Sequence, residues 1–111
     1  MADTTPLSFD VYEPLLGSTF KAVFSDAEID LILVEAKLKT DDSVMHSFML
    51  IFEGDPKYQF PQHNYTLRHE KLGEIVVFLV PLGPKEGAFQ LQAIFSVLKD
   101  QSYPEGKLSP Q

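Results

Sequence analysis

Apolar and polar residues alternate over several stretches of this chain, which is the period of strands that bury one face. The alternation is most regular near residue 93, where one face consists of Phe89, Leu91, Ala93, Phe95 and Val97. Two earlier stretches, Thr19–Phe24 and Met45–Phe52, have the same period. Their apolar faces consist of Phe20, Ala22 and Phe24, and of Phe48, Leu50 and Phe52. These patterns predict three strands.

Two further runs, Asn64–Glu70 and Glu74–Pro81, are rich in β-branched and aromatic residues. They are joined at Lys71-Leu72-Gly73, and prolines at Pro61 and Pro84 bound the pair. Short runs of this composition with a glycine-containing connection are typical of a β-hairpin.

The run Ile29–Leu38 is almost continuously apolar at its start, so its buried face is ambiguous. A β-bulge within it would reverse the face that points inward. A helix over Asp26–Lys39 is the main alternative, because Ala, Glu, Leu and Lys favour helix. We favour a strand, because the segment is β-branched and too apolar all round for a surface helix.

An N-terminal segment precedes these strands. Phe9, Tyr12, Leu15 and Leu16 recur at helical spacing, and Ser8 is a suitable N-cap, so we expect a short helical turn that plugs one end of the domain. A packed irregular arm is the alternative.

Six strands with short connections favour an all-β fold, an antiparallel up-and-down meander. Closing the meander into a small barrel would remove the exposed edges of an open sheet. In the 111-residue chain we expect a flexible N-terminus over 1–6, one domain over 7–98 and a disordered tail over 99–111.

The net charge of the chain limits the classes of partner that it is expected to bind. The net charge is −7 and Arg68 is the only arginine, so nucleic acid and anionic membranes are not expected to bind. The chain has no cysteine, and residues 1–10 lack the basic start and apolar run of a signal peptide. We expect a soluble cytoplasmic protein.

Catalytic chemistry has little support. His69 and Glu70 are adjacent, and neighbours on a strand point to opposite faces, so we expect His69 to bond a turn backbone. A metal site of His46, His63 and His69 with Glu53 or Glu70 lacks any local ligand spacing. No nucleophile elbow or phosphate loop is present. The sequence therefore favours a protein that is not an enzyme and has no cofactor or metal.

A contact surface is better supported. If Ile75, Val77 and Leu79 fill the core, the opposite face of the same strand carries apolar residues that a meander places beside the last strand. The predicted partner-binding residues are Val76, Phe78, Val80 and Ile94. Such a stripe would mark a protein partner or a homo-oligomer, unless the other face is buried or a terminal arm covers the stripe.

A small-ligand site is the alternative function. Its mouth would be formed by Gln62, His63, Tyr65 and His69. Six strands leave little interior room, since even eight-stranded barrels are nearly filled by side chains.

Several motifs of this chain are similar to those of a family of short bacterial proteins classed as a domain of unknown function. The matching motifs are Pro-Gln-x-x-Tyr-x-Leu-x-His at 61–69, Leu-Gly-Glu at 72–74, Phe-Leu-Val-Pro-x-Gly at 78–83 and Phe-x-Leu-x-Phe-x-Gly at 48–54. Gly17, Phe20 and Phe95 also match, and Tyr12 stands where the family has Phe. The resemblance covers Leu7–Val97. It implies an unassigned activity and an association with phage-tail-collar-like proteins, and hence an interaction module.

Overall fold

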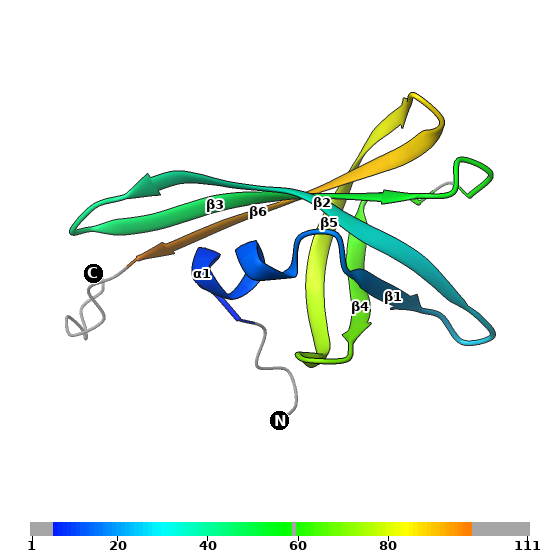
Figure 1. The fold of residues 1–111 in the computed structure, drawn as a ribbon, viewed down its shortest axis with the longest axis horizontal. Coiled ribbons are helices and arrows are strands. Elements are labelled where there is room, and N and C mark those ends of the chain that lie inside the picture. The colour runs from blue at the N-terminus through cyan, green and yellow to red at the C-terminus, as the bar shows by residue number, and fades with distance from the viewer. Residues whose placement is uncertain (1–5, 59, 99–111) are drawn as a thin grey trace.

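A computed structural model describes residues 6–58 and 60–98 of the chain (Figure 1). The elements in order are α1 (Phe9–Tyr12), η1 (Glu13–Leu15, a 3-10 turn), β1 (Thr19–Val23), β2 (Glu28–Asp41), β3 (Met45–Gly54), β4 (His63–His69), β5 (Gly73–Lys85) and β6 (Ala88–Leu98). The all-β class and the short N-terminal helix are confirmed. The predicted flexible N-terminus over 1–6, apart from Pro6, and the predicted disordered tail over 99–111 lie outside the described residues.

The six strands pair antiparallel in the order β1-β2-β3-β6-β5-β4, and β4 returns to pair with β1. This order corrects the predicted meander, in which β3 would pair with β4. The β3–β4 connection instead carries the chain across the end of the ring, so that β4–β5–β6 forms a second meander. Its first strand pairs with β1 and its last with β3, which closes both open edges of the first meander.

Part of the sheet projects beyond the ring. β5 pairs with β4 up to Leu79 and with β6 only from Val80 onward. The remainder of β6 continues beside β3 and β2 as a three-stranded extension, and α1 lies against it (Figure 1). The helical plug therefore covers the inner face of this extension.

Aromatic side chains fill the space between α1 and the extension. Phe48 is fully buried and stacks on Phe95 at 4.7 Å between ring centroids. Tyr12 packs 5.7 Å from each of these two rings, and its phenol donates to the Pro6 carbonyl at 2.8 Å. Burial raises the pKa of the Tyr12 phenol above its ordinary value. The predicted apolar faces of β1, β3 and β6 face the core, with Phe24 and Phe95 partly buried against it and Val97 outside it.

A bulge in β2 resolves the ambiguity of its pattern. The pairing register with β3 shifts between Leu33 and Glu35. Leu31 and Leu33 are fully buried before the shift, whereas Val34 is 41% exposed at it. The segment is a strand, and the bulge interrupts its alternation: Val34 and Glu35 are both exposed, and the inward face passes from Leu31 and Leu33 to Ala36.

The predicted hairpin is also confirmed. β4 and β5 pair from His63↔Leu79 to His69↔Gly73. Gly73 has φ +74°, a left-handed conformation that glycine adopts without strain and that most other residues avoid.

Candidate functional site

The outward face of β5 carries the predicted contact residues. Ile75, Val77 and Leu79 are buried in the core, so the alternate residues point away from it. Val76 is 44% exposed and Phe78 is 47% exposed. The structure therefore buries the face of this strand that the prediction required.

The other two predicted contact residues lie where β5 meets β6. Val80 is half-buried and pairs with Gln92. Ile94, two residues further along β6, lies on the outer face opposite Met49 of β3 and is 63% exposed. Val80 and Ile94 thus lie in adjacent rows of the sheet. Val76 and Phe78 lie on the part of β5 that pairs with β4.

Two apolar residues of β3 extend this surface and were missed from the sequence. Met49 and Ile51 point outward, because their neighbours Phe48 and Leu50 are fully buried inward. Ile51 is only 5% exposed and yet lies outside the interior core cluster. The sequence contained the signal for these two residues, because the alternation that buries Phe48 and Leu50 places Met49 and Ile51 on the outer face of β3. The outer apolar surface is defined as Val76, Phe78, Val80, Met49, Ile51 and Ile94.

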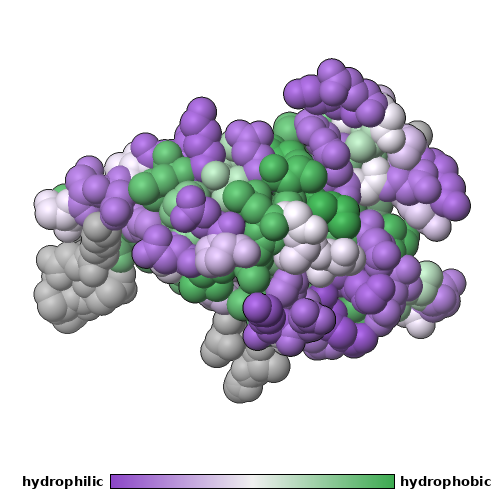
Figure 2. Space-filling model, viewed as in Figure 1, coloured by the Kyte–Doolittle hydropathy of each residue, from purple (hydrophilic) through white to green (hydrophobic). Residues whose placement is uncertain are grey.

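The outer apolar surface lacks charge. Its outward polar neighbours are Gln92, in the row of Val80 and Ile51, and Ser47 and Ser96, in the row beyond Met49 and Ile94. Gln92 donates to the Met49 sulfur at 3.1 Å. Among the described residues, ionisable side chains lie at its borders, at Glu35, Glu53, Lys37, Arg68 and Glu74. Figure 2 shows one face of the molecule, on which hydrophobic surface gathers in the middle and hydrophilic residues dominate the ends. In a chain with 23% charged residues, an uncharged region of this kind is distinctive.

His69 bonds neighbouring groups through both ring nitrogens. Its Nδ1 accepts a hydrogen bond from the Lys71 backbone N–H at 3.0 Å, so Nε2 carries the proton of the neutral ring. Nε2 therefore donates to the Ser18 hydroxyl at 2.9 Å, and that hydroxyl donates to the Leu15 carbonyl at 2.5 Å. This chain of bonds ties the end of β4 to the turn before β1, as expected of a histidine that bonds a turn backbone.

The same geometry bears on catalysis at this end of the molecule. His69 and Ser18 line an open pocket of about 610 Å³ together with Arg68 and Lys71. His69 donates to Ser18, however, and a general base would have to accept the serine proton. Burial lowers the pKa of His69 below its usual value, which keeps the ring neutral. The pair is arranged as a structural connection.

The four predicted mouth residues do not share one mouth. His69 lies at one end of β4, whereas Tyr65 lines a different pocket near the other end. Leu67, between them on the same face, is fully buried. Gln62 and His63 are exposed beside Tyr65. The ring interior between these ends is filled by core side chains, so alternation along one strand could not place the residues around a common cavity.

The three histidines lie in three different parts of the fold. His46 lies on the extension, His63 packs edge-on to Tyr65 at 5.6 Å, and His69 bonds Ser18. Over residues 6–58 and 60–98, no group of three or more His, Cys, Asp or Glu side chains has the arrangement of a metal site. The three histidines and Glu53 or Glu70, which the sequence did not favour as a metal site, are not brought together by the structure.

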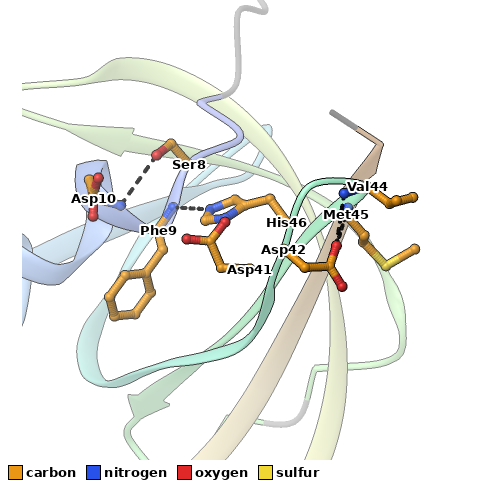
Figure 3. Close-up of polar contacts among 8 residues, drawn as sticks. All are labelled: Ser8, Phe9, Asp10, Asp41, Asp42, Val44, Met45 and His46. Atoms are coloured by element: carbon orange, nitrogen blue, oxygen red, sulfur yellow. Dashed lines mark hydrogen bonds and ion pairs between the residues drawn. The ribbon is translucent and has the colours of Figure 1, made fainter. Parts of the chain in front are cut away.

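His46 fastens the plug to the extension (Figure 3). Its Nε2 accepts from the backbone N–H of Phe9 at 3.0 Å, and its Nδ1 donates to the Asp41 carboxylate at 3.2 Å. The Phe9 N–H is one of the donors that a helix start leaves without an intrahelical partner. Ser8 caps the same turn by accepting from the Asp10 N–H at 3.3 Å.

We expect His46→Ala to lower the free energy of unfolding by about 1–2 kcal/mol, because it leaves the Phe9 N–H without its acceptor. Urea denaturation would measure the loss. His63→Ala is the matched control, because His63 is exposed and its removal should change stability by no more than about 0.5 kcal/mol. Equal stability of the two variants would show that His46 does not hold the plug.

Within the part of the chain that the structure describes, no helix is long and apolar enough to cross a membrane.

Comparison with known proteins gives a family and no function. A family model described as a domain of unknown function (DUF6916) matches residues 7–95. No curated protein and no solved structure matches the chain. The match spans the plug and nearly all of the strand ring, and it agrees with the kind of family expected from the motifs. The chain therefore belongs to the DUF6916 family of unknown function.

Proposed function

We propose that this protein is a non-enzymatic interaction module that acts through its outer apolar surface. The observation that carries the proposal is the exposure of large apolar side chains, led by Phe78 at 47% and Ile94 at 63%, on an uncharged part of a strongly acidic chain. Depletion of charge at the centre with polar residues at the rim is the composition of protein interfaces. The bonded state of His69 further favours a role other than catalysis.

The partner that we favour is a second copy of the chain. Two copies that each carry a net charge of −7 repel one another, and an uncharged surface is where they can approach most closely. A two-fold contact applies the same surface to itself, which suits an apolar surface whose polar neighbours are uncharged. A domain of 111 residues also gains from burial that its own core does not supply.

The biological setting is a proposal that rests on the motif resemblance. We infer a bacterial, cytoplasmic accessory subunit associated with phage-tail-like assemblies. Such assemblies are built from repeated subunits, which suits a module with one self-complementary surface.

Phe78→Glu is expected to weaken self-association at least about tenfold, because it places a charge at the centre of the apolar contact. Sedimentation velocity over a range of concentrations would measure the dissociation constant. Val44→Glu is the matched control, since Val44 is 59% exposed at the β2–β3 turn, away from the surface. It receives the same change of charge and should associate like the wild type.

Ile94→Glu tests whether the surface acts as one unit, because Ile94 lies on β6 and Phe78 on the part of β5 that pairs with β4. Both variants should lose association. If the wild type stays monomeric at high concentration, the proposal that the chain self-associates is wrong. A tagged pull-down with the wild type and Phe78→Glu would then decide whether another protein binds there, and identical recoveries would remove the proposal.

A further inference from the structure

A second site lies at the opposite end of β4 from His69 and goes beyond the proposed interaction surface. Three aromatic rings form a triangle there, contributed by Phe24, Phe60 and Tyr65. Their centroids are separated by 6.0 Å, 6.1 Å and 5.6 Å. The Tyr65 phenol donates to the Pro61 carbonyl, which holds its ring in place. The triangle is therefore a preformed aromatic wall.

This wall borders an open pocket of about 430 Å³. The pocket is also lined by Tyr58 from the β3–β4 connection and Ile29 from the start of β2. Tyr58 is 38% exposed, whereas Phe60 and Tyr65 are buried, so the pocket combines a fixed wall with an accessible ring. A volume of this size accommodates a small organic group.

The charge at the pocket is negative. Among the lining residues that the structure describes, Asp26 is the one with a charge at neutral pH, and Asp55 lines an adjoining pocket that shares Tyr58. Glu28 and Asp30 are nearby but are paired with Arg68 and Lys21. Among the residues that the structure describes, neither Asp26 nor Asp55 forms a salt bridge, so their charge remains available to a ligand.

A cation of the chain itself lies over the ring of Tyr58. The Lys57 ammonium is 5.2 Å from the centroid of the Tyr58 ring, within the range of a cation–π contact. Lys57 lines the adjoining pocket and not the aromatic one. The Tyr58 ring thus attracts a positive charge from the chain itself, and the aromatic pocket contains no cation of its own among its lining residues.

We propose that this pocket binds an organic cation of the quaternary or methylated ammonium class. Such cations are recognised by aromatic faces, because their diffuse charge is attracted to the ring quadrupole while their methyl groups need apolar contact. Asp26 adds a long-range attraction and would select against anions. An inorganic cation is disfavoured, because the pocket offers few oxygen ligands and would not replace its hydration shell.

The test compares choline with 3,3-dimethyl-1-butanol, which has the same shape but no charge. Isothermal titration calorimetry or chemical-shift titration should give saturable binding of choline, with the neutral analogue at least about fivefold weaker. Equal affinity for the two would overturn the proposal and leave an ordinary apolar pocket. No binding of choline would overturn it as well.

Variants locate the binding in this pocket. Tyr58→Leu keeps an apolar side chain but removes the ring and should weaken choline binding about tenfold, whereas Tyr58→Phe should retain it. Asp26→Asn should weaken it severalfold, with a smaller effect at high salt. Tyr58 is partly exposed, so these variants should fold like the wild type. Unchanged binding by Tyr58→Leu would place the ligand elsewhere. Phe78→Glu should bind choline normally, which separates this site from the outer apolar surface.

Discussion

Phe48→Ala is expected to lower the free energy of unfolding by about 3–5 kcal/mol, the usual cost of removing a fully buried Phe. Phe48 is 0% exposed and contacts the rings of Phe9, Tyr12 and Phe95. Its loss would leave a cavity between the plug and the extension that neither can close without moving the other. Because small domains are stable by about 5–15 kcal/mol, the change would remove a large part of the total.

Urea denaturation followed by circular dichroism would measure this effect. Ser47→Ala is the control at the adjacent position, because Ser47 points outward and makes only a long contact of 3.4 Å with Ser96. It should change stability by no more than about 0.5 kcal/mol. Similar losses in the two variants would contradict the inward and outward faces assigned to β3.

The wild type is expected to lose stability as the pH falls below about 6.5, the ordinary pKa of histidine. His69 is 3% exposed, and burial lowers the pKa of its ring in the folded protein. Its Nδ1 also accepts from the Lys71 N–H, which a protonated ring could not do. Between the folded and the unfolded pKa the unfolded chain binds more protons, so stability is complete above this range and decreases as the pH falls through it.

His69→Gln should be less stable than the wild type at pH 7.5, because glutamine cannot reproduce both hydrogen bonds of the ring. Its stability should nevertheless depend less on pH between about 6.5 and 5, because the titrating group is absent. Urea midpoints measured at several pH values for both proteins would check this. His46 and His63 are present in both proteins, so the difference isolates His69. Parallel pH profiles would show that His69 does not carry the effect.

The local patterns predicted most elements because strands and turns leave a direct trace in the order of residues. Alternation gave the buried faces of β1, β3 and β6, and the Ser8 signal gave the start of α1. The strand assignment of β2 depended on its β-branched composition, and the bulge between Leu33 and Glu35 explains why its alternation was irregular.

The contact surface was partly predictable for the same reason. Once Ile75, Val77 and Leu79 are buried, geometry forces Val76 and Phe78 outward. Met49 and Ile51 follow from the same rule, applied to β3. The four predicted mouth residues do not surround one cavity. Alternation indicates that Tyr65 and His69 share a face, but it does not show that a filled core separates them.

The sequence by itself determined the strands, the buried faces of β1, β3 and β6 and the helical plug, because these depend on residues that are neighbours along the chain. Only the tertiary structure decided that β3 pairs with β6 and that β4 closes onto β1, since alternation is the same whether β3 lies beside β4 or beside β6. It also decided the aromatic pocket, whose rings come from the residue directly after β1, the β3–β4 connection and β4. Sites of this kind depend on contacts between distant segments, and those contacts are set by how the ring closes and the core packs.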